Sequence, residues 1–235
     1  MPSSANSGAG AVIVAAGAGL RFGGAVRKQY VEVAGEPLLR RAVRPFAEHP
    51  GIAHVVIVLP PEDVASPPPW LAGLGSVVAG GEERTDSMRN GVEALSAEAD
   101  PVLIHDGARP FPSRELIDRV LAVARHSPVL PALPATDTLK QVNADGRVLG
   151  TLDRDGVWLA QTPQGFPRQT LERLHACARH DGIHCTDDAA LAERCGEPVR
   201  VVRGAAANLK VTHPEDLELA GALAAHFDLQ RARIR

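Results

Sequence analysis

The hydrophobic positions of the chain follow two periods, and the alternation between them predicts strands that alternate with helices. Short apolar runs ending in glycine, proline or a charged turn are typical of strands buried in a parallel sheet. Apolar residues that recur every three or four positions indicate helices. We assign strands to residues 11–16, 54–60, 76–81, 101–111 and 198–204. We assign helices to residues 37–48, 87–95, 168–180, 187–194 and about 214–226, with a further helix capped by Ser113.

This alternation predicts an α/β fold with a mostly parallel, Rossmann-like sheet that carries helices on both faces. Residues 131–161 depart from it, because they contain short β-like pieces separated by polar turns such as NADGR at residues 143–147. We interpret about 136–161 as a β-hairpin arm that projects from one domain spanning residues 11–226. Residues 208–212 look strand-like.

The two ends of the chain are expected to lie outside that domain. Residues 1–10 are small and polar, and they lack the basic and apolar regions of a signal peptide, so we expect a disordered tail. Residues 227–235 are expected to form a C-terminal tail. Because the chain ends soon after its last helix, we expect a form with one activity rather than a fusion to a second enzyme.

Composition narrows the function classes. The formal net charge of −3 disfavours a general nucleic-acid binder. No apolar run approaches the roughly 18 residues that a membrane-spanning helix needs. We therefore expect neither a nucleic acid nor a membrane as a partner. The three cysteines form no C-x-x-C pair, which fits a reducing compartment and a cytoplasmic location.

The first chemically suggestive segment is AAGAGLRFGG, at residues 15–24, directly after the first predicted strand. Gly17 and Gly19 allow backbone N–H groups to approach phosphates closely. No G-K-[ST] follows, so the loop is not a Walker A motif, and the third glycine of a dinucleotide fingerprint is replaced by Phe22. That spacing disfavours an NAD-linked dehydrogenase. A tight turn that merely requires glycine remains an alternative.

Charged residues near the predicted strand ends strengthen the phosphate hypothesis. Arg21 and Lys28 follow the glycine loop and could neutralise a triphosphate, although solvated surface charges are the usual fate of such residues. Asp106 ends a predicted strand, where a carboxylate can bind Mg²⁺ or a substrate hydroxyl. Arg109 can bind phosphate oxygens with two nitrogens, or it can pair with Asp106 and stabilise the turn. Lys210 alternates in direction with its apolar neighbours.

The segments AAGAGLRFG and RKQY resemble the opening signature of the sugar nucleotidyltransferases, and in detail the 2-C-methyl-D-erythritol 4-phosphate cytidylyltransferase family of the non-mevalonate isoprenoid route. Arg27 stands where that family usually has proline, and Gly107 where alanine is commoner. Further segments match the family in order and spacing over nearly the whole chain: GGEERTDSMRNGVEAL (80–95), HDGARPF (105–111), TDTLK (136–140), LDRDGVWLAQTPQGF (152–166), TDDAAL (186–191) and NLKVTHPEDL (208–217).

The resemblance implies a magnesium-dependent enzyme that transfers CMP from CTP to the polyol phosphate, with release of pyrophosphate. It implies catalytic roles for Arg21, Lys28 and Lys210, and Asp106 is a candidate metal ligand. The implied nucleotide-binding residues are Ala15, Ala16, Gly17, Gly19, Gly81, Glu82 and Ser87. The implied acceptor-binding residues are Asp106, Arg109, Thr138, Arg154 and Thr162, of which Thr138 and Arg154 would come from the arm of a partner subunit in a homodimer.

Several alternatives stay open at this stage. A ribitol 5-phosphate cytidylyltransferase would share the fold and most motifs, and a non-catalytic CTP-binding module would keep the loop without turnover. For single residues, Ser87 could be a helix N-cap, Arg154 a charge at the hairpin tip and Lys210 a solvent-facing lysine. Asp187 and Asp188 suit a helix N-terminus better than a substrate contact.

Overall fold

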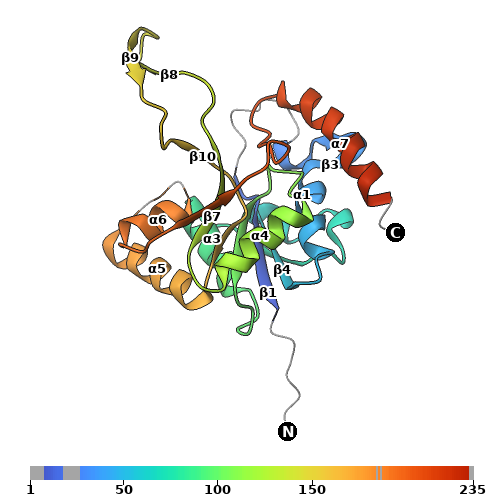
Figure 1. The fold of residues 1–235 in the computed structure, drawn as a ribbon. Coiled ribbons are helices and arrows are strands. Elements are labelled where there is room, and N and C mark those ends of the chain that lie inside the picture. The colour runs from blue at the N-terminus through green and yellow to red at the C-terminus, as the bar shows by residue number, and fades with distance from the viewer. Residues whose placement is uncertain (1–7, 18–26, 184, 186, 233–235) are drawn as a thin grey trace.

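The computed structural model describes residues 8–17, 27–183, 185 and 187–232 of the 235-residue chain (Figure 1). Gly19 and Arg21, which the sequence assigns to nucleotide binding and catalysis, lie outside the described residues. The described strands are β1 (Ala9–Val14), β2 (Glu32–Val33), β3 (Glu36–Pro37), β4 (Ile52–Leu59), β5 (Ser76–Ala79), β6 (Val102–Asp106), β7 (Val129–Pro134), β8 (Leu139–Val142), β9 (Val148–Leu152), β10 (Trp158–Ala160), β11 (Gln164–Phe166) and β12 (Arg200–Arg203). The described helices are α1 (Leu38–Ala47), α2 (Pro61–Val64), α3 (Arg84–Glu93), α4 (Arg114–Ala124), α5 (Arg168–Asp181), α6 (Asp188–Arg194) and α7 (Asp216–Ala232), with short 3-10 turns η1 (Lys28–Tyr30) and η2 (Pro69–Leu71).

One large sheet organises the described part of the chain. Its eight strands run in the order β10-β7-β11-β6-β1-β4-β5, with β12 paired to β7. The pairs β1–β4, β1–β6, β4–β5 and β12–β7 are parallel, whereas β11 and β10 run antiparallel to their neighbours. The predicted α/β architecture with a mostly parallel sheet is therefore confirmed.

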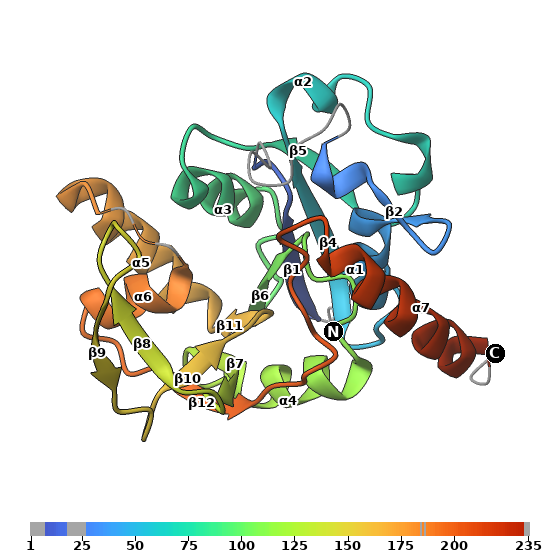
Figure 2. The same cartoon turned by 90° about the horizontal axis from the view of Figure 1, so that it is seen from above.

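Helices cover both faces of this sheet, as Figure 2 shows from above. Because successive side chains of a strand point to opposite faces, β1 contributes to two separate cores. Ala11 and Ile13 pack in the core that also contains residues of α1 and α4. Val12 packs in the second core, which contains residues of α3, α5 and α6. Fully buried aliphatic side chains on both faces hold the sheet against its helices and set the position of its strand ends.

Four segments differ from the sequence expectation. β7 and β11 were not predicted, because β7 contains prolines and β11 is short and partly polar, so neither has the pattern of a strand. Both form strands because they pair with neighbouring strands of the sheet. β10 belongs to the main sheet through its pairing with β7, although it falls in the predicted arm. Residues 208–212 form no strand, and the N–H of Val211 donates to the carbonyl oxygen of Ala108 instead, at 2.8 Å.

The ends of the domain also differ. β1 begins at Ala9, two residues inside the predicted tail, while residues 1–7 lie outside the described residues. α7 runs to Ala232, so the predicted C-terminal tail is wrong for residues 227–232. The buried guanidinium of Arg41 binds Asp228 through both Nη atoms, at 3.0 and 3.1 Å, and this pairing extends the helix beyond its predicted end. Within the described residues, no helix is both long enough and apolar enough to cross a membrane.

The arm is present as an antiparallel pair of β8 and β9 that projects away from the sheet (Figure 1). Its apolar side chains are exposed, with Leu149 at 61% and Val148 at 55%. A two-stranded hairpin is marginally stable alone in water, because it cannot bury both faces. The arm therefore differs from the rest of the described chain in having no core of its own.

Candidate active site

A cavity of about 510 Å³ lies where β1 and β6 end. In open α/β sheets this edge is the usual place for ligands, because the loops after parallel strands converge there. Nine residues that the sequence assigned to the site line it: Ala15, Ala16, Gly17, Lys28, Gly81, Glu82, Ser87, Asp106 and Lys210. The other lining residues are Val14, Gln29, Glu83, Arg84, Gly107, Ala108 and Thr212.

The loop between β5 and α3 is held in place by Ser87. Its hydroxyl accepts a hydrogen bond from the N–H of Gly81 at 3.1 Å and donates to the carbonyl oxygen of Glu83 at 3.2 Å. Glu83, not Ser87, is the N-cap of α3, and it forms a capping box with Asp86. The N-cap alternative for Ser87 is therefore wrong. Gly80 is required here, because a Cβ atom would lie 2.3 Å from the Cβ of Ala16.

The carboxylate of Asp106 is the charged centre of the cavity. Its Oδ1 accepts from Arg84 Nη2 at 3.0 Å, and its Oδ2 accepts from Lys210 Nζ at 2.8 Å, with Arg109 Nε 3.8 Å from Oδ2. Burial alone would raise the pKa of Asp106, but the charges of Arg84, Lys210 and Arg109 hold that pKa well below its usual range. Asp106 is therefore an anion at every physiological pH.

The two described lysines of the predicted catalytic set converge on this cavity. Lys28 donates from Nζ to the carbonyl oxygen of Val211 at 3.0 Å, which joins η1 to the segment that carries Lys210. The side chain of Lys210 is 42% exposed, so it faces the open cavity even as it binds Asp106. Two cations separated by 182 positions in sequence thus meet at the edge where a triphosphate could bind.

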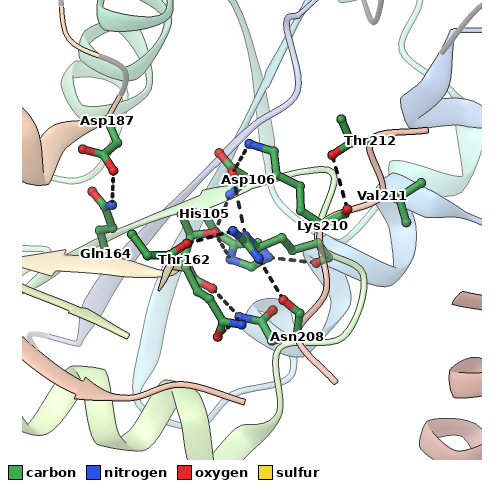
Figure 3. A network of polar contacts seen from close by, with 12 residues as sticks. His105, Asp106, Thr162, Gln164, Asp187, Asn208, Lys210, Val211 and Thr212 are labelled. Carbon is green, nitrogen blue, oxygen red and sulfur yellow. Dashed lines mark hydrogen bonds and ion pairs between the residues drawn. The ribbon is translucent and has the colours of Figure 1, made fainter. Parts of the chain in front are cut away.

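A network of buried polar side chains adjoins Asp106 and Lys210, and Figure 3 shows its contacts. The Nε2 of His105 lies 2.9 Å from the carbonyl oxygen of Arg109, which can only accept, so Nε2 carries the proton. Nδ1 is then an acceptor, and the hydroxyl of Thr162 donates to it at 3.0 Å while accepting from the N–H of Asp106. Burial lowers the pKa of His105 to about 4, so the ring is neutral near pH 7.

Asn208 connects this network to the Lys210 segment. Its side chain is fully buried, and its Nδ2 donates to the carbonyl oxygen of Thr162 at 2.8 Å. The backbone carbonyl oxygen of Asn208 accepts a hydrogen bond from Arg109 Nη1 at 2.9 Å. The segment has no regular secondary structure, so these bonds determine where Lys210 lies.

Two predicted acceptor-binding residues have a different place. Arg109 is 9% exposed, and its Nη atoms donate to the carbonyl oxygens of Asn208 and Ala160. Thr162 is 4% exposed, and its hydroxyl is occupied by Asp106 and His105. Neither is among the residues that line the cavity, and within one chain both support the loops beneath it. Their assignment to acceptor binding stays a prediction. For Arg109, the turn-stabilising alternative fits the geometry.

Thr138 and Arg154 lie on the arm and do not line the cavity of their own chain. Arg154 donates through Nη1 to the carbonyl oxygen of Thr136, which places it at the base of the β8–β9 pair rather than at the hairpin tip. The expectation that a partner subunit delivers both residues stays a prediction. Asp187 is the N-cap of α6 and accepts from the N–H of Ala190 at 2.8 Å, as the helix-terminus interpretation expected.

Sequence reasoning assigned no role to Arg84, Gln29, Thr212 or Asn208. Arg84 stands within a quoted motif, but an arginine at a helix start looks like a solvated surface charge until its partners are known. Asn208 looks like a loop residue, and only its complete burial shows that it is structural.

The comparisons with known proteins agree with this geometry. Residues 9–226 match the family described as IspD, 2-C-methyl-D-erythritol 4-phosphate cytidylyltransferase. A relative with that name from Syntrophus aciditrophicus is 40% identical over 219 residues, covering 90% of this chain and 94% of the relative. The crystal structure of the 2-C-methyl-D-erythritol 4-phosphate cytidylyltransferase from Thermus thermophilus is 37% identical, with a TM-score of 0.79 and coverage of 91% of this chain and 98% of that one.

Other relatives are longer proteins. A bifunctional enzyme IspD/IspF from Solidesulfovibrio magneticus is 47% identical over 221 residues, covering 88% of this chain and 54% of the relative. A second one, from Anaeromyxobacter dehalogenans, is also 47% identical, with 56% of the relative covered. The chain thus spans about half the length of these bifunctional relatives. With the match over residues 9–226, these findings show that the chain belongs to the IspD family, the 2-C-methyl-D-erythritol 4-phosphate cytidylyltransferases.

Proposed function

We propose that the protein transfers CMP from CTP to 2-C-methyl-D-erythritol 4-phosphate and releases pyrophosphate, a step towards isoprenoid precursors. The observation that carries this proposal is the convergence of Lys28, Lys210 and Asp106 on one cavity with the loop backbone after β1, in a member of this family. Backbone groups of Ala15, Ala16 and the Gly81 loop would read the edge of the cytosine.

The chemistry needs little from the protein beyond positioning and charge. A phosphate oxygen of the acceptor attacks the α-phosphorus of CTP in line, and the bond from that phosphorus to pyrophosphate breaks. Because a phosphate monoester is already an anion near neutral pH, no side chain has to remove a proton. The barrier lies in negative charge that accumulates on the transferred group and on the leaving group. Lys28 and Lys210 would compensate that charge, with Arg21 added by family resemblance.

We include Mg²⁺ in the proposal as an ion bound together with the triphosphate. Mg²⁺ keeps several waters and is usually held by one or two carboxylates plus substrate phosphates. Within residues 8–17, 27–183, 185 and 187–232, no group of three or more His, Cys, Asp or Glu side chains could hold a metal. Glu82, Glu83 and Asp106 line the cavity, and the carboxylate of Asp106 at the end of β6 is our candidate for such partial ligation. When bound, the ion would neutralise charge on phosphate oxygens.

We also propose a homodimer that forms through the arm, and a cytoplasmic location. Exposed apolar side chains on the arm strands β8 and β9, and on β10 at the edge of the main sheet, support the dimer, because they would otherwise remain in water. These side chains are Val142, Val148, Leu149, Leu152, Trp158 and Leu159. In such a dimer, Thr138 and Arg154 of the partner subunit would complete the acceptor side of the cavity.

The proposed cytoplasmic location is supported by the three cysteines, which are unpaired, as is usual in a reducing compartment.

The test is pyrophosphate release with each of the four nucleoside triphosphates and a panel of polyol phosphates. The proposal expects turnover with CTP and 2-C-methyl-D-erythritol 4-phosphate, and loss of turnover when Mg²⁺ is removed by a chelator. Preference for ribitol 5-phosphate would assign the alternative acceptor. Binding of CTP without pyrophosphate release from any acceptor would indicate the non-catalytic module and overturn the proposal.

A further inference from the structure

Arg84 lies between two carboxylates, that of Asp106 at the cavity and that of Asp188 in the protein interior. It is the first residue of α3, and its side chain is 28% exposed. Nη2 donates to Asp106 Oδ1 at 3.0 Å on the cavity side. Nη1 lies 3.9 Å from Asp188 Oδ2 on the interior side. The two ends of one guanidinium therefore face two negative charges.

Asp188 has no solvent contact at all, since its side chain is 0% exposed. Its Oδ1 lies 3.1 Å from Nε2 of His175, which is itself 4% exposed. A carboxylate only accepts hydrogen bonds, so this ring nitrogen carries the proton. Oδ2 has no hydrogen-bond partner within the described residues. A buried carboxylate is costly unless cations or donors surround it, so Arg84 and His175 are the groups that make Asp188 tolerable.

From this arrangement we propose that Arg84, held from behind by Asp188 and His175, is a positioning residue that fixes the orientation of the Asp106 carboxylate. The inference rests on the proposed function in that Asp106 is taken to bind the hydroxyl groups of the acceptor. Asp188 comes from α6 and His175 from α5, so the orientation of a cavity carboxylate is set by two helices that do not reach the cavity.

The geometry separates this role from that of a mobile phosphate-binding arginine. A guanidinium free to follow an incoming phosphate should have solvent or flexible partners on at least one side. Arg84 instead donates from Nη2 to Asp106, and its Nη1 donates to the sulfur of Met88 at 2.7 Å and forms an ion pair with the fully buried carboxylate of Asp188. The planar fork of arginine can face two carboxylates at once, whereas the single ammonium of lysine reaches one of them. Both oxygens of Asp106 are thereby directed, one by Arg84 and the other by Lys210.

The kinetic test uses Asp188→Asn and Arg84→Lys in the full chain. Both should raise the KM for the acceptor about tenfold, because a misplaced binding group weakens acceptor binding, with the KM for CTP little changed. Asp187→Asn is the matched control, since it removes the same charge one residue away and asparagine caps a helix about as well as aspartate. Unchanged acceptor KM in folded Arg84→Lys would overturn the inference.

A second readout does not depend on turnover. In protein labelled with ¹³C,¹⁵N-arginine, a guanidinium held at both ends rotates slowly and gives separate Nη signals, which Arg84→Lys assigns by their loss. Asp188→Asn should merge these signals, and Asp187→Asn should not. A single averaged Arg84 signal in the wild type would contradict the proposal. Wild-type protein that shows the separate signals but no pyrophosphate release would instead contradict only the proposed function.

Discussion

The residues below the cavity and the residues of the projecting arm differ in how they are held in place. The former are buried and hydrogen-bonded, and the latter are largely exposed. Below the cavity, His105 and Asn208 are fully buried, and their hydrogen bonds join β6, the residues before β11 and the Lys210 segment. On the arm, Leu149 is 61% exposed and the two strands pair only with each other. The side chains below the cavity are therefore held by their own chain, whereas the arm leaves its apolar side chains exposed in a single chain.

The largest expected effect tests the cavity side. Lys28→Ala should lower kcat about a hundredfold to a thousandfold, because it removes one of the charges that stabilise the transition state. The protein should stay folded, since Lys28 contributes a bond to one carbonyl oxygen at the cavity rim. Pyrophosphate release and thermal unfolding would be measured together. Arg114→Ala is the control, because it removes an exposed charge on α4 and should stay within about twofold of the wild type.

The buried network below the cavity should show itself in the pH dependence of stability. The pKa of His105 is about 4 in the folded state, against an ordinary value near 6.5 in the unfolded chain. Between these values the unfolded state binds more protons, so the free energy of unfolding falls as pH is lowered from 6.5 to 4, by up to about 3 kcal/mol. Above pH 6.5 this contribution is constant. Urea unfolding at several pH values should show a shallower acid slope in His105→Gln, and parallel slopes would contradict the prediction.

The arm should respond at the level of assembly. Leu149→Asp places a charge on its exposed apolar face, and the proposed dimer should dissociate because that face could no longer be buried. Turnover should fall at least about tenfold, since the partner's arm would no longer position the acceptor, while CTP binding should persist. Light scattering, pyrophosphate release and calorimetry measure the three quantities. Leu219→Asp is the control, because Leu219 is 57% exposed on α7 and away from the arm. A monomeric wild type would remove the arm from the site.

The smallest effect concerns Arg27, next to Lys28. Arg27, which replaces the family's usual proline, pairs with Glu62 and Asp63 at 2.5 Å each, and Tyr30 donates to Asp63 at 2.6 Å. These contacts tie the residue before Lys28 to α2. Since partly exposed ion pairs contribute little, Arg27→Ala should keep turnover within about twofold of the wild type, and the difference should shrink at high salt. A much larger loss of turnover would show that the contacts of Arg27 are needed to position Lys28, and would contradict this prediction.

The main sheet and part of the site could be predicted, because their signals are local. Apolar runs identified β1, β4, β5 and β6, and residues placed just after them, such as Asp106, were bound to meet at one edge. β7 and β11 could not be predicted, since their strand character comes from partners. The same limit applies to Arg109 and Thr162: their residue types suit phosphate binding, and only the structure shows that they also donate to or accept from neighbouring loops.

By itself, the sequence determined the alternation of strands and helices, the family, and the presence of cations near a glycine-rich loop, because each of these depends on residue types at short spacing. The tertiary structure decided which charges face one another. Arg84 and Asp188 are 104 positions apart, and no local pattern relates them. They face each other because α3 and α6 pack on the same face of the sheet. In our proposal, Arg84 held by the buried Asp188 orients the carboxylate of Asp106.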